Sequence, residues 1–297
     1  MNENKLLAAL PKLFHQDSDL AVGPGDDCAL IKFGGKYLLA AADQLIQDVH
    51  YFPDTPPEAV AAKLLKRNLS DIAAMGGIPR WTICTLACNG CSDEFFMRFF
   101  NALEACAKKY QCAIAGGDLA ELPTSGTVAT LTILGEVELE KVCLRSNARP
   151  GELIFVTGQL GDTLYSQHHL EFEPRLAEGR FLSENAFSCC MMDISDGLAA
   201  DLPRLLERSS CGAHIQLDKL PCRNNCSWQS AIADGEDYEL LFTTSADRAG
   251  KLLEVWPFDT PLSCIGQITA DAGTVRYYQD AEEITLNGVN GYEHFRA

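Results

Sequence analysis

Short acidic clusters are the part of this sequence best suited to chemistry. Each places an aspartate close to glycine, serine or alanine, and glycine lets the backbone approach a ligand closely. Magnesium is typically held by a few carboxylates together with the phosphates of a substrate. A single cluster would most often be a turn or a helix cap. Five together predict a site for divalent cations and phosphates: Gly25-Asp26-Asp27, Asp43, Asn68-Leu69-Ser70-Asp71, Gly116-Gly117-Asp118 and Asp193-Ile194-Ser195-Asp196-Gly197.

The position of Asp71 on a helix strengthens this prediction. A helix is expected over residues 56–75, and at about 100° per residue its apolar side chains cover one half of the surface. Asp71 and Asn68 project within that apolar half, and the opposite half carries Lys63, Lys66, Arg67 and Ser70. Because an unpaired buried carboxylate costs several kcal/mol, Asp71 needs a partner. That partner is a metal ion or, in the simpler alternative, an arginine from elsewhere in the chain.

Charge and missing motifs exclude several classes of protein. The net charge of −17 argues against a nucleic-acid partner, because a phosphate backbone requires stripes of Lys and Arg. The sequence has no GxxxxGK[ST] phosphate loop and no HRD or DFG motif, which excludes the P-loop and protein-kinase folds. It has no run of eighteen apolar residues, and the charged start over residues 1–5 is a poor signal peptide. These features predict a cytoplasmic protein without membrane contact.

The thirteen cysteines leave one alternative metal site open. Most of them lie in apolar stretches, as small buried side chains do in a reducing compartment. Cys88-x-x-Cys91 and Cys222-x-x-x-Cys226 together would supply four thiolates for zinc. Their spacing is loose and no histidine accompanies them, so the aspartates remain the favoured metal ligands.

Strands and helices must mix along the chain to position these clusters. A hairpin turned at Gly34-Gly35 is expected, and helices are expected over 56–75, 92–109 and 159–168. The length of 297 residues favours two domains of about 150 residues each. Arg149-Pro150-Gly151 is the expected boundary, because a buried strand begins at Leu153. The pattern predicts an α+β fold with domains at 1–148 and 149–297.

Conspicuous motifs follow one another along the chain in a fixed order. They are Gly25-Asp26-Asp27-Cys28-Ala29, 43–51, 68–76, Gly116-Gly117-Asp118, 145–151, 193–198, 235–240 and the closing Gly291-Tyr292-Glu293-His294-Phe295. Together they resemble the thiamine-monophosphate kinase family, within the superfamily typified by aminoimidazole ribonucleotide synthetase. The resemblance runs from about residue 22 to the end of the chain. Its most specific strings are NLSDIAAMG at 68–76 and DISDGL at 193–198.

The resemblance implies a two-domain enzyme that transfers the γ-phosphate of ATP directly to thiamine monophosphate. The N-terminal domain would bind ATP and metal ions and pair with its copy in a homodimer, and the C-terminal domain would be a second α/β unit. Such a transfer needs alignment and charge neutralisation more than a catalytic side chain. The implied magnesium ligands are Asp26, Asp43, Asp71, Asp118, Asp193 and Asp196. The implied ATP contacts are Gly117, Asp118, Arg145 and Ser195, and the implied substrate contacts are His50, Glu236 and Tyr292.

Several departures from the family pattern surround the expected nucleotide and metal positions. Ala41 and Ala42 stand where the family has hydroxyl residues before Asp43, so a metal ion there would lose ligands or take water. Gln47-Asp48 replaces a Glu-Gly pair, and Asp234 replaces a glycine. Two alternatives therefore stay open. One is a catalytically weakened paralogue that binds nucleotide or thiamine phosphates, and the other is a different ATP-dependent enzyme of the same superfamily.

Overall fold

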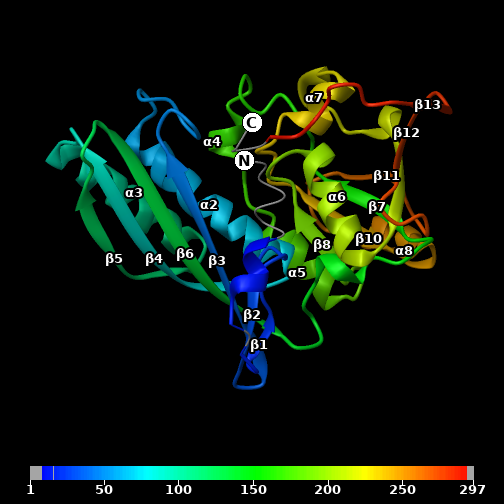
Figure 1. Ribbon diagram of the computed structural model, residues 1–297, viewed down its shortest axis with the longest axis horizontal. Helices are drawn as coiled ribbons and strands as arrows, with labels where there is room; N and C mark the ends of the chain where they lie inside the picture. The colour runs from blue at the N-terminus through cyan, green and yellow to red at the C-terminus, as the bar shows by residue number, and fades with distance from the viewer. Residues whose placement is uncertain (1–8, 16, 293–297) are drawn as a thin grey trace.

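The chain forms two β-sheets with helices packed between and around them (Figure 1). The computed structural model describes residues 9–15 and 17–292. The expected signal-free start at 1–5 and the motif residues Glu293 to Phe295 therefore lie outside the described residues. The mixture of helices with parallel and antiparallel strands confirms the predicted α+β class.

The first sheet has six strands in the order β1-β2-β3-β6-β4-β5. The hairpin between β2 and β3 turns at Gly34 and Gly35 as predicted, with φ of 56° and 83°, angles that glycine adopts without steric cost. Alternate residues of β6 are buried, because one sheet face packs against helices. The strand bounds are Leu20–Val22, Ala29–Phe33, Lys36–Ile46, Ile78–Asn89, Ala113–Glu121 and Gly126–Glu138 for β1, β2, β3, β4, β5 and β6. A short 3-10 helix, η1, precedes them at Leu10–Leu13.

Two long helices, α2 (Pro57–Ala74) and α3 (Asp93–Lys109), belong to this half. The α3 helix begins after Ser92, whose hydroxyl accepts a hydrogen bond from the Phe95 amide at 3.2 Å, a standard N-cap. Both helices contribute to one apolar core with the sheet. In Figure 1, α2 runs between the six-stranded sheet and the second half of the molecule.

The α2 helix is buried on both sides, including the half opposite its apolar side chains. Lys63, Lys66 and Ser70 are only 0%, 6% and 1% exposed. Helices α4 (His168–Glu171) and α5 (Leu176–Glu184) and strand β8 pack against this side. Apolar periodicity identified the first buried face but missed the second, because polar atoms satisfy the lysines there. The Lys66 ammonium, for example, donates to the Leu170 carbonyl at 2.9 Å.

The second sheet has seven strands in the order β13-β12-β9-β11-β7-β10-β8. Its strands β7 to β13 are Leu153–Thr157, Cys190–Asp193, Gly212–Gln216, Leu240–Thr244, Leu262–Thr269, Val275–Gln279 and Glu282–Ile284. Helices α6, α7 and α8 span Leu198–Ser209, Trp228–Ala233 and Ala246–Val255. Short 3-10 helices are η2 (Arg145–Asn147), η3 (Leu217–Lys219) and η4 (Arg223–Asn225).

The helix expected over 159–168 is wrong. Gly158 and Gly161 adopt φ of 60° and 78°, outside the helical region. The Gly161 backbone also lies so close to α7 that an added Cβ would be 2.7 Å from the Ala231 amide nitrogen. The segment therefore forms turns, and helix begins only at His168.

The connection between the sheets runs from the end of β6 to the start of β7, over residues 139–152. The predicted division between residues 148 and 149 lies within this connection and remains a prediction. None of the helices in the described part of the chain has the length and apolar character needed to cross a bilayer.

Candidate metal and phosphate site

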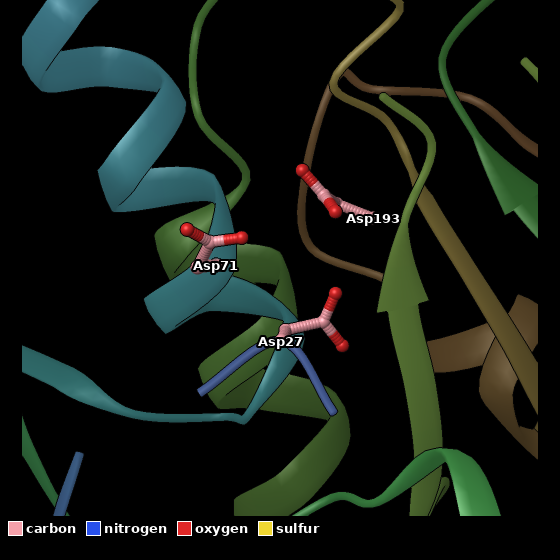
Figure 2. Close-up of side chains that lie close together, drawn as sticks. All are labelled: Asp27, Asp71 and Asp193. Carbon is pink, nitrogen blue, oxygen red and sulfur yellow. The ribbon is translucent and has the colours of Figure 1, made fainter. Parts of the chain in front are cut away.

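Three aspartates from distant parts of the chain converge between the two halves of the molecule (Figure 2). Asp27 lies in the loop before β2, Asp71 in the last turn of α2 and Asp193 at the end of β8. One carboxylate oxygen of each lies within 4.8 Å of the others. No other group of three or more His, Cys, Asp or Glu side chains in the described residues is close enough to share a metal ion. The four-thiolate alternative is therefore not supported, and all thirteen cysteines are free.

The charge of this group is only partly balanced by protein. Arg145 binds Asp27, with its Nη2 2.6 Å from Oδ1, and Asp193 accepts a hydrogen bond from the Ser70 hydroxyl at 2.6 Å. No ion pair joins Asp71 or Asp193 to a cation among the residues that the structure describes. Burial raises the pKa of Asp71 and of Asp193, and the charges of neighbouring aspartates raise both further.

These properties fit a divalent cation. The group offers three hard carboxylate oxygens, which are ligands that magnesium accepts. Without a cation, two or three negative charges would have to share a poorly solvated space, and protonation would be the only relief. A magnesium ion would relieve the same repulsion while the carboxylates stay ionised.

The structure brings Asp27 into this group, whereas the sequence prediction named its neighbour Asp26. The Asp26 carboxylate accepts a hydrogen bond from the Arg145 backbone amide at 3.2 Å. Burial and the charge of Asp27 raise the pKa of Asp26 to about 7. Asp26 therefore lies beside the group and fixes the segment that carries Arg145. An Asp-Asp pair in a loop has no periodicity, so the sequence holds no signal for which carboxylate points inward.

Asp43 lies on β3 and is engaged by α2. Its Oδ2 accepts from the Nε of Arg67 at 3.0 Å, and its amide donates to the Asn68 side-chain oxygen at 3.2 Å. Side chains alternate along a strand, so Ala41 is on the same sheet face as Asp43 and Ala42 is on the other. Ala41 packs against the N-terminal core, and Ala42 is exposed.

Gly117 and Asp118 are not brought to the aspartate group within one chain. Both lie exposed on β5, where Asp118 pairs with Thr85 of β4. Three strand spacings separate β5 from β3, which is about 14 Å. Glycine is required at position 117 for packing as well, because a Cβ there would be 1.8 Å from the Cys84 carbonyl oxygen.

Ser195 and Asp196 lie in the turn between β8 and α6. Their backbone amides donate to Oδ2 of Asp201 at 3.0 Å and 2.9 Å. Arg204 bridges the carboxylates of Asp196 and Asp201, with its Nη1 2.6 Å and 2.7 Å away. Neither Asp201 nor Arg204 was predicted from the sequence. Their i, i+3 spacing on one helix was the available signal.

The three predicted substrate residues line one cavity of about 100 Å³. His50, Glu236 and Tyr292 share it with Arg67 and with Ser195, so it opens beside the β8–α6 turn. Glu236 is paired with Lys63 of α2 at 2.7 Å. The Tyr292 amide donates to the Asp196 carbonyl at 2.9 Å, which connects this residue to the same turn.

Backbone geometry resolves two of the departures from the family pattern. Asp234 has a φ of −66°, which any residue adopts, so a glycine is not required there. Asp48 has a φ of 64°, a left-handed conformation that aspartate tolerates better than most residues. Glu236 and Tyr238 also have positive φ, 55° and 51°, so the loop that carries Glu236 is strained, as functional loops often are. Neither substitution disrupts the fold of the site.

Comparison with known proteins identifies the family. Residues 25–137 match the AIR synthase related protein, N-terminal domain, and residues 126–279 match the AIR synthase related protein, C-terminal domain. The chain is 35% identical to the thiamine-monophosphate kinase of Escherichia coli K12, over 93% of each chain. It is 30% identical to the thiamine-monophosphate kinase of Bacillus subtilis, over the full length of both.

Solved structures lead to the same family. The structure described as AaThiL complexed with AMPPCP and TMP superposes with a TM-score of 0.84 at 26% identity, over 99% of this chain and 97% of the other. Sequence identity and fold therefore agree over nearly the whole length of the protein. The chain belongs to the thiamine-monophosphate kinase family.

Proposed function

We propose that this protein acts in the cytoplasm and phosphorylates thiamine monophosphate to thiamine diphosphate, with ATP as the donor and magnesium as the metal ion. One observation carries the proposal. A group of aspartates with unbalanced charge lies between two halves of the chain. The cavity that contains His50, Glu236 and Tyr292 lies beside the β8–α6 turn, which follows Asp193 of that group. A relative of the same fold is described in complex with AMPPCP and TMP, which supports these two substrates.

Asp27, Asp71 and Asp193 would hold magnesium at this junction. When bound, the metal supplies charge neutralisation for phosphates, the main requirement of phosphoryl transfer. Arg145 orients Asp27, and Ser70 orients Asp193. Asp196 is a further candidate ligand, with Arg204 balancing its charge. No protein nucleophile is needed if the two phosphates are held in line.

The cavity would hold the thiazolium-bearing acceptor. Tyr292 offers an aromatic face, which suits a positively charged ring. Glu236 lines the same cavity with its charge paired to Lys63. The cavity also contains a cation, Arg67, which suits the acceptor's phosphate.

We also propose a homodimer formed through the six-stranded sheet. Large apolar side chains on β4 and β5 are exposed, namely Trp81 (46%), Ile83 (41%) and Leu119 (60%). Strand β5 is an edge strand and carries the isolated Gly117 and Asp118. Pairing with a second copy would cover this edge and offer Asp118 to a shared nucleotide site.

Product analysis tests the function. The protein would be incubated with ATP, magnesium chloride and thiamine monophosphate, and the thiamine phosphates and nucleotides separated by chromatography. Thiamine diphosphate and ADP should form in equal amounts, and none should form with a chelator or with unphosphorylated thiamine in place of the monophosphate. Binding of both substrates without turnover would favour the weakened-paralogue alternative. No binding of thiamine monophosphate would contradict the proposed acceptor.

A further inference from the structure

Arg67 holds an unusual position in α2. Its side chain is 12% exposed and lines the cavity that contains His50 and Tyr292. Its Nε donates to Asp43 at 3.0 Å and its Nη1 to the Gln44 carbonyl at 3.1 Å. These two bonds fix the plane of the guanidinium, and Nη2 has no hydrogen bond to a residue that the structure describes.

Asp43 does not fit the role of a metal ligand in this chain. Its carboxylate is paired with Arg67 and lies outside the group of carboxylate oxygens that are within 4.8 Å of one another. Asp27 is also paired with an arginine, Arg145, but it lies inside that group. The residue on the same sheet face one pleat away is Ala41, a methyl group packed against the core, which offers no oxygen. The Asp43 amide is also occupied by the Asn68 side chain. The position expected to bind metal therefore holds a resident cation instead.

The surroundings of Arg67 indicate what it binds. Three acidic side chains line the cavity with Arg67, and each has another partner. Glu236 is paired with Lys63, Asp196 is paired with Arg204, and Asp234 accepts hydrogen bonds from the Asp162 amide and the Ser230 hydroxyl. The Nη2 of this fixed guanidinium can donate a charge-assisted hydrogen bond to a phosphate oxygen. We propose that Arg67, held by Asp43, replaces a metal ion at this position and binds the phosphate of the acceptor molecule. This inference rests on the proposed function, because it assigns the phosphate group of that acceptor.

Ligand selectivity tests the phosphate half of the inference. Dissociation constants would be measured without ATP for thiamine monophosphate and for thiamine, on the wild type, Arg67→Gln and Arg67→Lys. Loss of a charge-assisted contact should weaken thiamine monophosphate binding by about ten- to hundredfold in Arg67→Gln. Thiamine binding should not change, and Arg67→Lys should recover part of the loss. Arg80→Gln, which removes an exposed arginine on β4, is the matched control. Equal losses for both ligands, or no loss, would overturn the assignment.

A metal count tests the Asp43 half independently of the acceptor. Bound Mn²⁺ would be counted by electron paramagnetic resonance in the presence of AMPPCP. The wild type and Asp43→Asn should bind the same number of ions. Loss of one ion in Asp43→Asn would show that Asp43 is a ligand after all and would overturn the inference. This count needs no thiamine compound. An error in the proposed acceptor would therefore appear only in the affinities for thiamine monophosphate, whereas an error in the Asp43 assignment would appear in the metal count.

Discussion

The buried Glu239 and the group of Asp27, Asp71 and Asp193 differ in how their charge is balanced. In the C-terminal half, Glu239 is 1% exposed and receives two bonds from Arg175, at 2.7 Å and 2.5 Å, and a third from the Thr157 hydroxyl at 2.7 Å. At the junction of the two halves, Asp71 and Asp193 are also in poorly solvated positions, but no arginine or lysine pairs with either among the described residues.

The difference separates a structural carboxylate from a functional one. Glu239 is satisfied by protein alone, so folding offsets the cost of burying its charge. The charges of the aspartates at the junction are not offset by protein, so their repulsion is relieved only when a cation binds. The stability of this region is therefore coupled to metal binding. The Arg67–Asp43 ion pair lies between these two extremes: the carboxylate is balanced by protein, as in Glu239, but the pair borders the candidate site.

The largest expected effect comes from neutralising the unbalanced group. Asp71→Asn keeps the size of the side chain and removes its charge, so the metal loses a ligand. Phosphorylation of thiamine monophosphate should fall by about a hundredfold or more, since even outer-shell partners of a metal are worth 10- to 100-fold. Thermal unfolding of the metal-free variant should match the wild type or occur at a higher temperature, because one repulsive charge is gone. Near-normal turnover would remove Asp71 from the metal site.

The same chemical change in the balanced group should act on stability instead. Glu239→Gln removes the carboxylate that Arg175 contacts at 2.5 Å and leaves this mostly buried arginine only the more distant Glu178, at 3.7 Å. Unfolding in urea should show a loss of about 3 kcal/mol. Addition of magnesium should still stabilise this variant, in contrast to Asp71→Asn. If Glu239→Gln kept its stability but was no longer stabilised by magnesium, Glu239 would be part of the metal site and not a structural carboxylate.

Two aromatic side chains extend the comparison to substrate binding. Tyr238 is 2% exposed and stacks on Phe172 with ring centroids 4.0 Å apart, whereas Tyr292 is 38% exposed at the cavity. Tyr292→Ala should weaken thiamine monophosphate binding by roughly two- to thirtyfold, the loss of a cation–π contact. ATP binding should not change. Tyr165→Ala, at an 89% exposed tyrosine, serves as the control. Equal losses for both ligands would indicate a structural role for Tyr292.

The smallest effect concerns pH. The pKa values of Asp71 and Asp193 are raised in the folded state, so the metal-free protein binds protons that the unfolded chain has released. The contribution of these two aspartates to the stability of the metal-free protein should therefore fall as pH rises above the ordinary carboxylate pKa of 3.8. Magnesium competes with those protons, so it should raise the melting temperature more at neutral than at mildly acidic pH. A magnesium effect that grows toward acid would contradict this sign.

Most of the fold was accessible from the sequence where local rules dominate. The turn at Gly34-Gly35, the cap at Ser92 and the alternation in β6 all follow from short-range geometry. The second buried face of α2 was not accessible, because Lys63 and Lys66 are polar residues that find partners only in the tertiary structure. The failed helix at 159–168 has a similar cause, since the close approach of Gly161 to α7 is a long-range contact.

The sequence predicted which kinds of residue form the candidate site, but not every individual residue. Asp71 and Asp193 do lie together, and His50, Glu236 and Tyr292 line one cavity. Sequence proximity gave no way to choose between Asp26 and Asp27, because the choice depends on the direction of one loop side chain. The ion pair between Asp43 and Arg67 could not be predicted from the sequence either, because it is a tertiary contact between β3 and α2.

Metal binding to the aspartate group is the most direct test of the central claim. Binding of Mn²⁺ would be followed by electron paramagnetic resonance, without nucleotide, on the wild type, Asp71→Asn and Glu239→Gln. The wild type and Glu239→Gln should bind the ion with the same affinity, and Asp71→Asn should bind it about tenfold more weakly or not at all. If Asp71→Asn binds Mn²⁺ as tightly as the wild type, the unbalanced charge at the junction is not a metal site.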